Sequence, residues 1–362
     1  MLKRLYVKNF TVFAEADFAF GPGLNVVVGT NGTGKSHVLK LGYAAARTSQ
    51  ELGAKPLPPS KANWQETLAE RLQQVFLPDS LGRLARRTQG TKRAEVEIAF
   101  SGTAQAKAGF SFYFATSASK EVKMEVSPTQ YLQQAPVFLP TKEVVSIFPG
   151  LRGLFTERAI SLDLTYPDLC ARLDTPLSVG PRLEKVKGLL AQLEAAMGGH
   201  ISNDNGRFYL KPKTGGKLEI NLVAEGVRKL ATLAYLLNNG SLNENSLLFW
   251  DEPEANLNPA LLKELAAVLV GLTRQGFQII LATHSLFLLK ELHILSRPKG
   301  AEKLPMRYFG LNAGPDGATT VNTVDDFEKL PDIVALDVEM EQADTLTLVF
   351  AQDDADHHGE KR

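Results

Sequence analysis

The sequence predicts an α/β fold with a mixed, mostly parallel sheet and an antiparallel β-subdomain at the N-terminus. Three observations support this prediction. A β-branched run at 24–28 precedes a glycine-rich turn and a helical pattern. Two more apolar runs, 246–250 and 277–282, each end in polar side chains, as buried parallel strands do when they deliver residues to one sheet edge. Alternating apolar and polar residues at 2–7 and 16–20 predict short antiparallel strands before the first buried strand.

The glycine-rich turn fits the pattern G-x-x-x-x-G-K-[ST]. Between a strand and a helix, the backbone N–H groups of such a turn bind phosphate. Lys35 would reach the β- and γ-phosphates, and Ser36 would hold Mg²⁺ through its hydroxyl. A plain glycine turn with a solvated lysine is the alternative, which the flanking strand and helix disfavour. The expected nucleotide contacts are Gly29, Asn31, Gly32, Thr33, Gly34, Lys35, Ser36 and His37.

The bulk composition excludes several classes of protein. The chain has 362 residues, of which 44% are hydrophobic and 22% charged, typical of a soluble globular protein. Forty basic residues balance forty acidic ones, so no overall charge draws the chain to nucleic acid or membrane. The single cysteine, Cys170, excludes an intrachain disulfide framework and suits a reducing cytoplasm. The sequence has no apolar run of about 18 residues, so it predicts no membrane span.

The second apolar run carries two carboxylates, Asp251 and Glu252, at its C-terminal end, and Pro253 stops any continuation of the strand. In a phosphate-binding enzyme, Asp251 would be a Mg²⁺ ligand, because Mg²⁺ prefers carboxylate and phosphate oxygens. Glu252 would then act as the general base that orients the attacking water.

The third apolar run ends in Thr283-His284-Ser285, also at a strand tip. A lone histidine is often structural. At this position, downstream of the Asp-Glu pair, His284 is expected to touch the γ-phosphate. A different local signal lies in residues 83–93, which hold five basic residues and no acidic one. That segment is either a solvated loop or a contact to a nucleic-acid backbone.

Composition and periodicity divide the chain into four segments. Residues 1–140 form the N-terminal half of the nucleotide-binding head, with an insertion at 50–93. Residues 141–200 form a helical lobe, residues 201–350 the C-terminal half, and residues 351–362 a polar tail. Further predicted elements are helices at 64–76, 182–197, 259–273, 285–294 and 331–342, a helix start at 141–146, strands at 94–100, 109–115, 121–126, 136–140, 306–311 and 318–321, and a hairpin of 207–212 with 217–222 around Gly215-Gly216.

These motifs together resemble those of a known family. Residues 29–36 resemble the G-P-N-G-S-G-K-S loop of ABC-type ATPases. Residues 251–259 resemble the Walker B motif and D-loop of the SMC/RecF/OLD-like branch, often written D-E-P-E-x-x-L-H-P. Residues 282–285 resemble its switch-histidine segment, and residues 5–10 its first strand. The likeness covers roughly 1–48 and 217–295, plus the Leu139–Glu143 stretch.

The resemblance implies two ATP molecules held between two heads, each bound by one P-loop and by the partner's signature helix. The signature candidate is residues 222–230, with Ala224 where a serine hydroxyl would be and Gly226 retained. The missing hydroxyl predicts weaker closure and slower hydrolysis; an ordinary amphipathic helix is the alternative. Asn258 would contribute from the D-loop. The Q-loop residue stays open among Gln133, Gln134, Lys142 and Glu143.

The expected function is an ATP-binding and ATP-hydrolysing switch that forms a head-to-head homodimer or higher oligomer with ATP and Mg²⁺. It would control a partner, which is either DNA or a separately encoded nuclease or toxin. The setting would be bacterial genome maintenance or anti-phage defence. We expect neither a long coiled coil nor a TOPRIM domain. A non-catalytic ATP-dependent scaffold is the main alternative, and a transporter subunit fits less well. The protein is expected in the cytoplasm, without a membrane partner.

Overall fold

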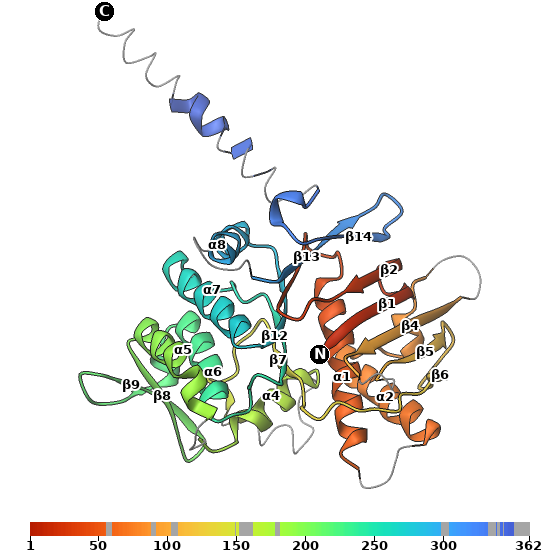
Figure 1. The fold of residues 1–362 in the computed structure, drawn as a ribbon, viewed down its shortest axis with the longest axis horizontal. Helices are drawn as coiled ribbons and strands as arrows, with labels where there is room; N and C mark the ends of the chain where they lie inside the picture. Colours follow the sequence, from red (N-terminus) through yellow and green to blue (C-terminus); the bar gives the residue numbers. More distant parts are fainter. Residues whose placement is uncertain are drawn as a thin grey trace, which may run out of the picture.

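The computed structural model of the chain (Figure 1) describes residues 1–55, 60–87, 92–102, 108–148, 150–151, 162–177, 182–297, 304–331, 338, 341–342 and 344–350. Most of the predicted closing helix at 331–342 and all of the predicted polar tail at 351–362 lie outside these residues. Within them the strands form three sheets. Among the described helices, none combines the length and the apolar character that crossing a membrane requires.

The central sheet has six strands in the order β14-β13-β3-β12-β11-β7. It is parallel except for β14, which pairs antiparallel with β13. Helices and the second sheet cover both faces, which explains why its inner strands are uninterrupted apolar runs. The strands are β3 (Leu24–Gly29), β7 (Val137–Leu139), β11 (Leu247–Asp251), β12 (Gln278–Thr283), β13 (Met306–Ala313) and β14 (Thr319–Val324).

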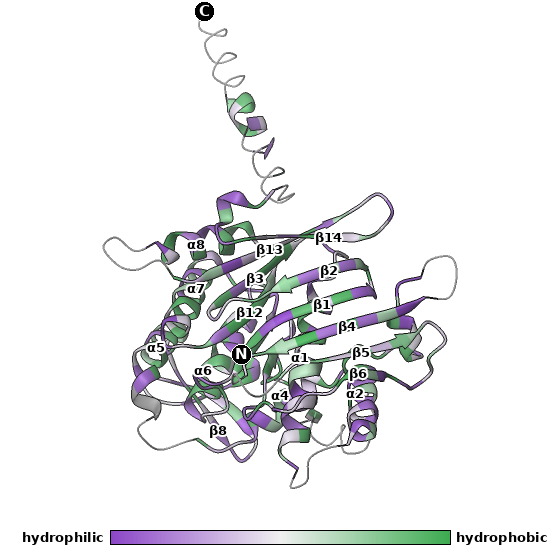
Figure 2. Cartoon of the chain, turned by 45° about the vertical axis from the view of Figure 1, so that its right-hand side comes forward, coloured by the Kyte–Doolittle hydropathy of each residue, from purple (hydrophilic) through white to green (hydrophobic). Residues whose placement is uncertain are grey.

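The second sheet is antiparallel, as predicted, with the order β2-β1-β4-β5-β6. Apolar and polar residues alternate along its strands, so green and purple bands follow one another along β1 and β4 in Figure 2. Its apolar face packs with α1 and α2. Helix α1 ends at Gly53, and α2 begins at Lys61. The elements are β1 (Leu2–Phe10), β2 (Phe13–Ala19), β4 (Arg93–Phe100), β5 (Phe110–Ala115), β6 (Lys123–Val126), α1 (Lys35–Gly53), α2 (Lys61–Phe76) and η1 (Leu81–Leu84).

The third sheet contains a strand that the sequence analysis missed. The predicted hairpin of β9 (Arg207–Pro212) and β10 (Leu218–Glu219) exists, but β8 (Gly199–Asp204) pairs with β9 on its other side. The turn between β8 and β9 is Asn205-Gly206, with φ of 54° and 81°. Asn-Gly is a strong signal for a tight hairpin turn, so this strand could have been predicted. Residues 220–222 form a short 3-10 helix, η2, instead of continuing β10.

The predicted helical segment at 141–200 contains α4 (Thr165–Leu173) and α5 (Arg182–Met197) among its described residues. The predicted helix start at 141–146 instead forms bends and turns. Leu173 and Leu193 share one hydrophobic cluster with the central sheet and the C-terminal helices. A lobe with its own boundary therefore stays a prediction. The other helices are α6 (Glu225–Asn238), α7 (Pro259–Arg274), α8 (Leu286–Ser296) and η3 (Phe327–Lys329).

Strand β11 separates two hydrophobic clusters. Leu248 and Trp250 belong to the cluster on the side of α5–α8, whereas Leu247 and Phe249 belong to the cluster under α1 and the antiparallel sheet. Successive side chains of a strand point to opposite faces. Both faces are therefore buried, and the strand delivers its polar residues only at its C-terminal end.

Candidate nucleotide-binding site

The register of the central sheet brings the three predicted motifs to one edge. Val28 of β3 pairs with Thr283 of β12, and Asp251 of β11 pairs with Ala282. The P-loop, the Asp251-Glu252 pair and His284 therefore leave neighbouring parallel strands at the same level. In open α/β sheets, ligands bind at the carboxyl ends of the strands.

The phosphate-binding turn has the backbone that its glycines predict. Gly32 and Gly34 have φ of 84° and 93°, in the left-handed region that favours glycine. Gly34 is also the N-cap of α1. A Cβ on Gly34 would lie 2.6 Å from Cγ2 of Val12 and 2.8 Å from Cζ of Phe13, so space as well as φ requires glycine there. At Gly32, no described atom lies within 4 Å of such a Cβ.

Lys35 folds back over the turn. Its Nζ donates hydrogen bonds to the carbonyl oxygens of Gly29 at 2.8 Å and Thr30 at 3.0 Å. Burial lowers the pKa of Lys35, and the nearby carboxylates of Glu252 and Asp251 partly oppose that shift. The lysine is thus a cation held at the mouth of the phosphate cradle and close to the predicted catalytic acids.

Asp251 has the properties of a metal ligand. Its carboxylate is buried at the C-terminal end of β11, near Ser36 of the P-loop. Burial raises the pKa of Asp251, while Ser36, Lys40 and Lys35 oppose the shift. Its Oδ1 is buried and accepts no hydrogen bond from the described residues. An unpaired carboxylate oxygen beside a serine hydroxyl is the donor set that Mg²⁺ prefers.

Glu252 sits in a strained turn directly after β11. Its φ is 48°, which costs a non-glycine residue about 1–2 kcal/mol. Its backbone N–H donates to the carbonyl oxygen of Ala282 at 3.0 Å, which continues the contact between β11 and β12. The turn directs a half-buried carboxylate toward the tip of β12, where Nδ1 of His284 lies 3.6 Å from Oε1 of Glu252.

Glu254 is a residue of the site that the sequence analysis did not single out. Its side chain is 7% exposed, and its Oε1 accepts hydrogen bonds from Oγ1 of Thr283 at 2.6 Å and from the backbone N–H of His284 at 3.0 Å. Nδ1 of His284 lies 3.5 Å from the same oxygen, while the imidazole is half exposed. Its place as the second glutamate of the Asp-Glu-Pro-Glu segment is the sequence feature that could have pointed to it.

The signature candidate begins α6 with a free helix N-terminus. Ala224 is the N-cap and offers no side-chain acceptor to the first N–H groups, while Leu222 just before it is 74% exposed. Gly226 is required by packing, because a Cβ there would lie 2.6 Å from the carbonyl oxygen of Asn256. In this chain, Gly226 thus lets α6 approach the D-loop of its own head.

Two other predicted contacts have structural partners. His37 packs against Phe76 with ring centroids 5.9 Å apart, and burial lowers the pKa of His37. Asn258 caps α7, since its side chain accepts a hydrogen bond from the N–H of Leu261 at 2.9 Å. These contacts explain both residues without a nucleotide, so their roles in binding stay predictions.

Comparison with known proteins agrees with this geometry. Residues 4–143 match a family model described as an AAA domain, and residues 148–290 match one described as an AAA domain, putative AbiEii toxin, Type IV TA system. The Smc head domain from Pyrococcus yayanosii superposes with a TM-score of 0.56 at 12% identity, covering 94% of this chain and 99% of that one. An Smc head bound to the C-terminal winged-helix domain of ScpA gives 0.55 at 15% identity, covering 90% and 98%.

Two curated relatives share parts of the sequence. The Old nuclease of Escherichia phage P2 is 28% identical over 130 residues, which are 35% of this chain and 20% of the relative. The DNA replication and repair protein RecF of Salmonella arizonae is 43% identical over 56 residues, 14% of this chain and 16% of the relative. These matches together support placing the chain among the ABC-type P-loop ATPases of the SMC/RecF/OLD-like group. The chain matches only about a fifth or less of the length of these two relatives.

The four candidate Q-loop residues differ in their surroundings. Glu143, after β7, is buried and lies 3.0 Å from Nε of Arg228 on α6. Lys142, Gln133 and Gln134 are exposed. Glu143 is thus the member of this group that joins the sheet edge to the signature helix.

The positive charge of the basic segment 83–93 is partly neutralised by ion pairs. Arg83 lies 3.5 Å from Asp79, Arg86 lies 3.5 Å from Asp316, and Arg93 lies 2.8 Å from Glu95. The two remaining basic residues of the run, Arg87 and Lys92, are exposed. The run therefore offers less free positive charge than its composition suggests.

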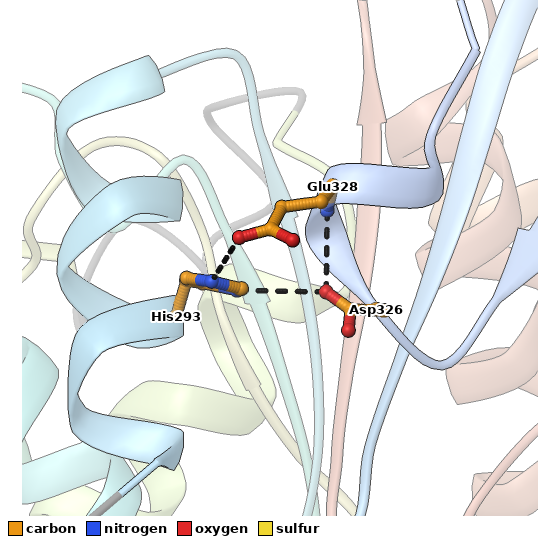
Figure 3. Close-up of side chains that lie close together, drawn as sticks. All are labelled: His293, Asp326 and Glu328. Atoms are coloured by element: carbon orange, nitrogen blue, oxygen red, sulfur yellow. Dashed lines mark hydrogen bonds and ion pairs between the residues drawn. The ribbon is translucent and has the colours of Figure 1, made fainter.

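A second cluster of ligand-type side chains lies between α8 and η3 (Figure 3). Nε2 of His293 lies 3.2 Å from Oε1 of Glu328, and its Nδ1 lies 3.8 Å from Oδ1 of Asp326. Arg297 also pairs with Asp326 and lies 3.9 Å from Glu328. Because Arg297 already pairs with Asp326 and lies close to Glu328, we interpret the cluster as an ion-pair network that joins α8 to η3.

Proposed function

We propose that the protein is an ATP-hydrolysing switch whose heads associate when ATP is bound. The observation that carries this proposal is the convergence of Lys35, Asp251 and the Glu252–His284 pair at one edge of the sheet. A P-loop alone supports nucleotide binding. A carboxylate held beside an imidazole, next to a metal-ligand aspartate, supports hydrolysis.

The residues divide the reaction among them. The backbone N–H groups of the turn and Lys35 would hold the phosphates, and Ser36 with Asp251 would hold Mg²⁺. Mg²⁺, when bound, neutralises charge on the β- and γ-phosphates. Glu252 would accept the proton of the attacking water. His284, placed by Glu254, would donate a hydrogen bond to the γ-phosphate oxygens as charge develops on them.

Head-to-head association is supported by the surface around the signature candidate. The uncapped N-terminus of α6 can offer backbone N–H groups to the phosphate bound by a partner head. The exposed Leu222 beside it suits burial in an interface. Ala224 supplies no hydroxyl to the γ-phosphate, so closure should be weaker and turnover slower than with serine at this position.

The partner of the switch is proposed from the relatives. RecF is named for DNA replication and repair, and Old is named a nuclease, so DNA is the first candidate. The description of a putative toxin in a matching family model makes a separately encoded toxin or nuclease the second candidate, in anti-phage defence. RecF and Old are each matched by this chain over only part of their length, so both partners are proposals for this chain.

The test is ATP turnover of the wild type against Glu252→Gln, with molecular mass measured with and without Mg²⁺–ATP. We expect Glu252→Gln to bind ATP, to lose turnover by at least about 100-fold, and to accumulate as an ATP-bound dimer. Glu121→Gln, an exposed acid in the N-terminal half, is the matched control and should behave as wild type.

Equal turnover in wild type and Glu252→Gln would overturn the catalytic assignment. If neither protein hydrolyses ATP but both dimerise with it, the non-catalytic scaffold is correct. Absence of an ATP-dependent change in mass, with turnover intact, would overturn the head-to-head association alone.

A further inference from the structure

Two adjacent basic residues of α6 reach the two loops that flank the predicted nucleotide. Arg228 lies 3.0 Å from Oε1 of Glu143, in the loop after β7. Nζ of Lys229 donates to the backbone carbonyl of Glu252 at 3.3 Å, in the turn after β11. The signature helix therefore holds both loops at the carboxyl edge of the sheet from within the same chain.

Lys229 is an unusual residue for a helix interior. It is 3% exposed, and no carboxylate lies within 4 Å of its Nζ in the part of the chain that the structure describes. Removing an ammonium group from water is costly unless partners compensate. Burial lowers the pKa of Lys229, and Glu225, Glu254, Glu252 and Asp251 oppose that shift from a distance. The ammonium donates its hydrogen bond to the backbone of the turn that carries Glu252.

The turn that Lys229 contacts has a strained backbone. Glu252 has a φ of 48°, and such a conformation persists only where its surroundings hold it. The carbonyl oxygen of Glu252 accepts hydrogen bonds from the N–H of Ala255 at 3.2 Å and from Lys229. One bond is local to the turn, and the other comes from α6.

A further contact places α6 against the same segment. The approach of Gly226 to Asn256 leaves no room for a Cβ. The helix therefore touches the Walker B and D-loop segment at Gly226 and, one turn later, at Lys229. A displacement of α6 would move the turn that carries the Glu252 carboxylate.

We propose that Lys229 is a positioning residue that holds the Glu252 turn from the signature helix, so that hydrolysis in one head depends on the placement of that head's own α6. This inference rests on the proposed ATP hydrolysis. In a head-to-head dimer, α6 faces the nucleotide of the partner. Lys229 then couples occupancy of the partner's site to the orientation of the general base in its own head.

The first test compares Lys229→Met with wild type in steady-state ATP turnover and in nucleotide binding. We expect kcat to fall about tenfold or more, because a charge-assisted hydrogen bond to the catalytic turn is lost, with KM and ATP affinity within about twofold. Lys229→Arg keeps a donor and should recover part of kcat. Thr232→Val is the matched control on the same buried face of α6. Among the described residues, the Thr232 hydroxyl donates to the carbonyl of Arg228 and to no other group, so the kcat of this variant should be unchanged.

A mixed dimer separates coupling within a head from an effect on the partner. In a dimer of one Lys229→Met chain and one Glu252→Gln chain, the sole remaining general base belongs to the chain without Lys229. We expect turnover at least about tenfold below that of a wild-type/Glu252→Gln dimer. Turnover equal to that reference dimer, or wild-type kcat in the first test, would overturn the role of Lys229. If Glu252→Gln itself keeps full turnover, the proposed function has failed instead.

Discussion

Oε1 of Glu254 lies 3.5 Å from Nδ1 of His284 and accepts a 3.0 Å hydrogen bond from the backbone N–H of the same residue. One carboxylate oxygen therefore fixes both the backbone and the ring of the switch histidine. The Glu254 carboxylate beside Nδ1 therefore also orients the imidazole ring of His284. The imidazole is placed by the segment that also carries Glu252.

Glu254→Ala should destabilise the protein and impair turnover. The substitution leaves the Thr283 hydroxyl and the His284 N–H buried without an acceptor, which costs about 1–3 kcal/mol for each group. Urea denaturation should show a loss of about 2–4 kcal/mol, whereas Glu121→Ala, at an exposed acid, should change stability by less than about 0.5 kcal/mol. Equal stability of the two variants would contradict the role of Glu254.

Two glycines of the P-loop should differ when each is replaced by alanine. Both Gly32→Ala and Gly34→Ala place a Cβ in a left-handed conformation, at about 1 kcal/mol. Only at Gly34 does the new Cβ meet Val12 and Phe13, which adds about 1–3 kcal/mol. Thermal or urea unfolding should therefore show a clearly lower stability for Gly34→Ala than for Gly32→Ala. Matching losses would show that Val12 and Phe13 move aside freely.

Asp251 should make the nucleotide-free protein less stable as pH rises. Its folded-state pKa is raised above the ordinary value of 3.8, chiefly by burial, so the folded state binds more protons between those two values. The free energy of unfolding contributed by this group therefore falls as pH rises through that window. Asp251→Asn removes the buried charge, and we expect it to be more stable than wild type at neutral pH without nucleotide.

With nucleotide present, Asp251→Asn should instead lower the stability of the protein relative to wild type. Mg²⁺–ATP at about 100 times its Kd should stabilise wild type by about 2.7 kcal/mol. Asp251→Asn lacks the carboxylate proposed to hold Mg²⁺ and should gain clearly less. Thermal shift assays at pH 5 and pH 7, with and without Mg²⁺–ATP, measure both effects. An Asp251→Asn protein that is less stable than wild type in every condition would contradict the stated cost of burying the charge.

If DNA is the partner, its contact in the basic segment 83–93 should come from Arg87 and Lys92, which have no acidic partner among the residues that the structure describes. Neutralising Arg87 and Lys92 should weaken DNA binding and reduce the slope of log affinity against log salt by about 2. The control is the double substitution of Arg83 and Arg93, which removes the same charge from residues that are already ion-paired. Unchanged affinity in the first variant, measured by fluorescence anisotropy over a salt series, would make the run a solvated face.

Local signals predicted most of the fold. Buried strands, amphipathic helices and the alternating N-terminal sheet carry periodicities that depend only on nearby residues. The strand β8 was missed although Asn205-Gly206 signals its turn. The helix start expected at 141–146 forms bends and turns, and Glu143 there pairs with Arg228, about 85 residues later in the chain. Such a long-range pair leaves no trace in local periodicity.

The glycine-rich turn, the strand-borne Asp251-Glu252 pair and His284 could be predicted as a site from the sequence, because each belongs to a short motif with a fixed spacing. How α6 meets them depends on packing between distant segments. Lys229 looks in sequence like any helical lysine, and it becomes a contact of the catalytic turn only because Gly226 lets the helix approach so closely. Close packing between segments distant in sequence brings those groups together, and no local pattern encodes it.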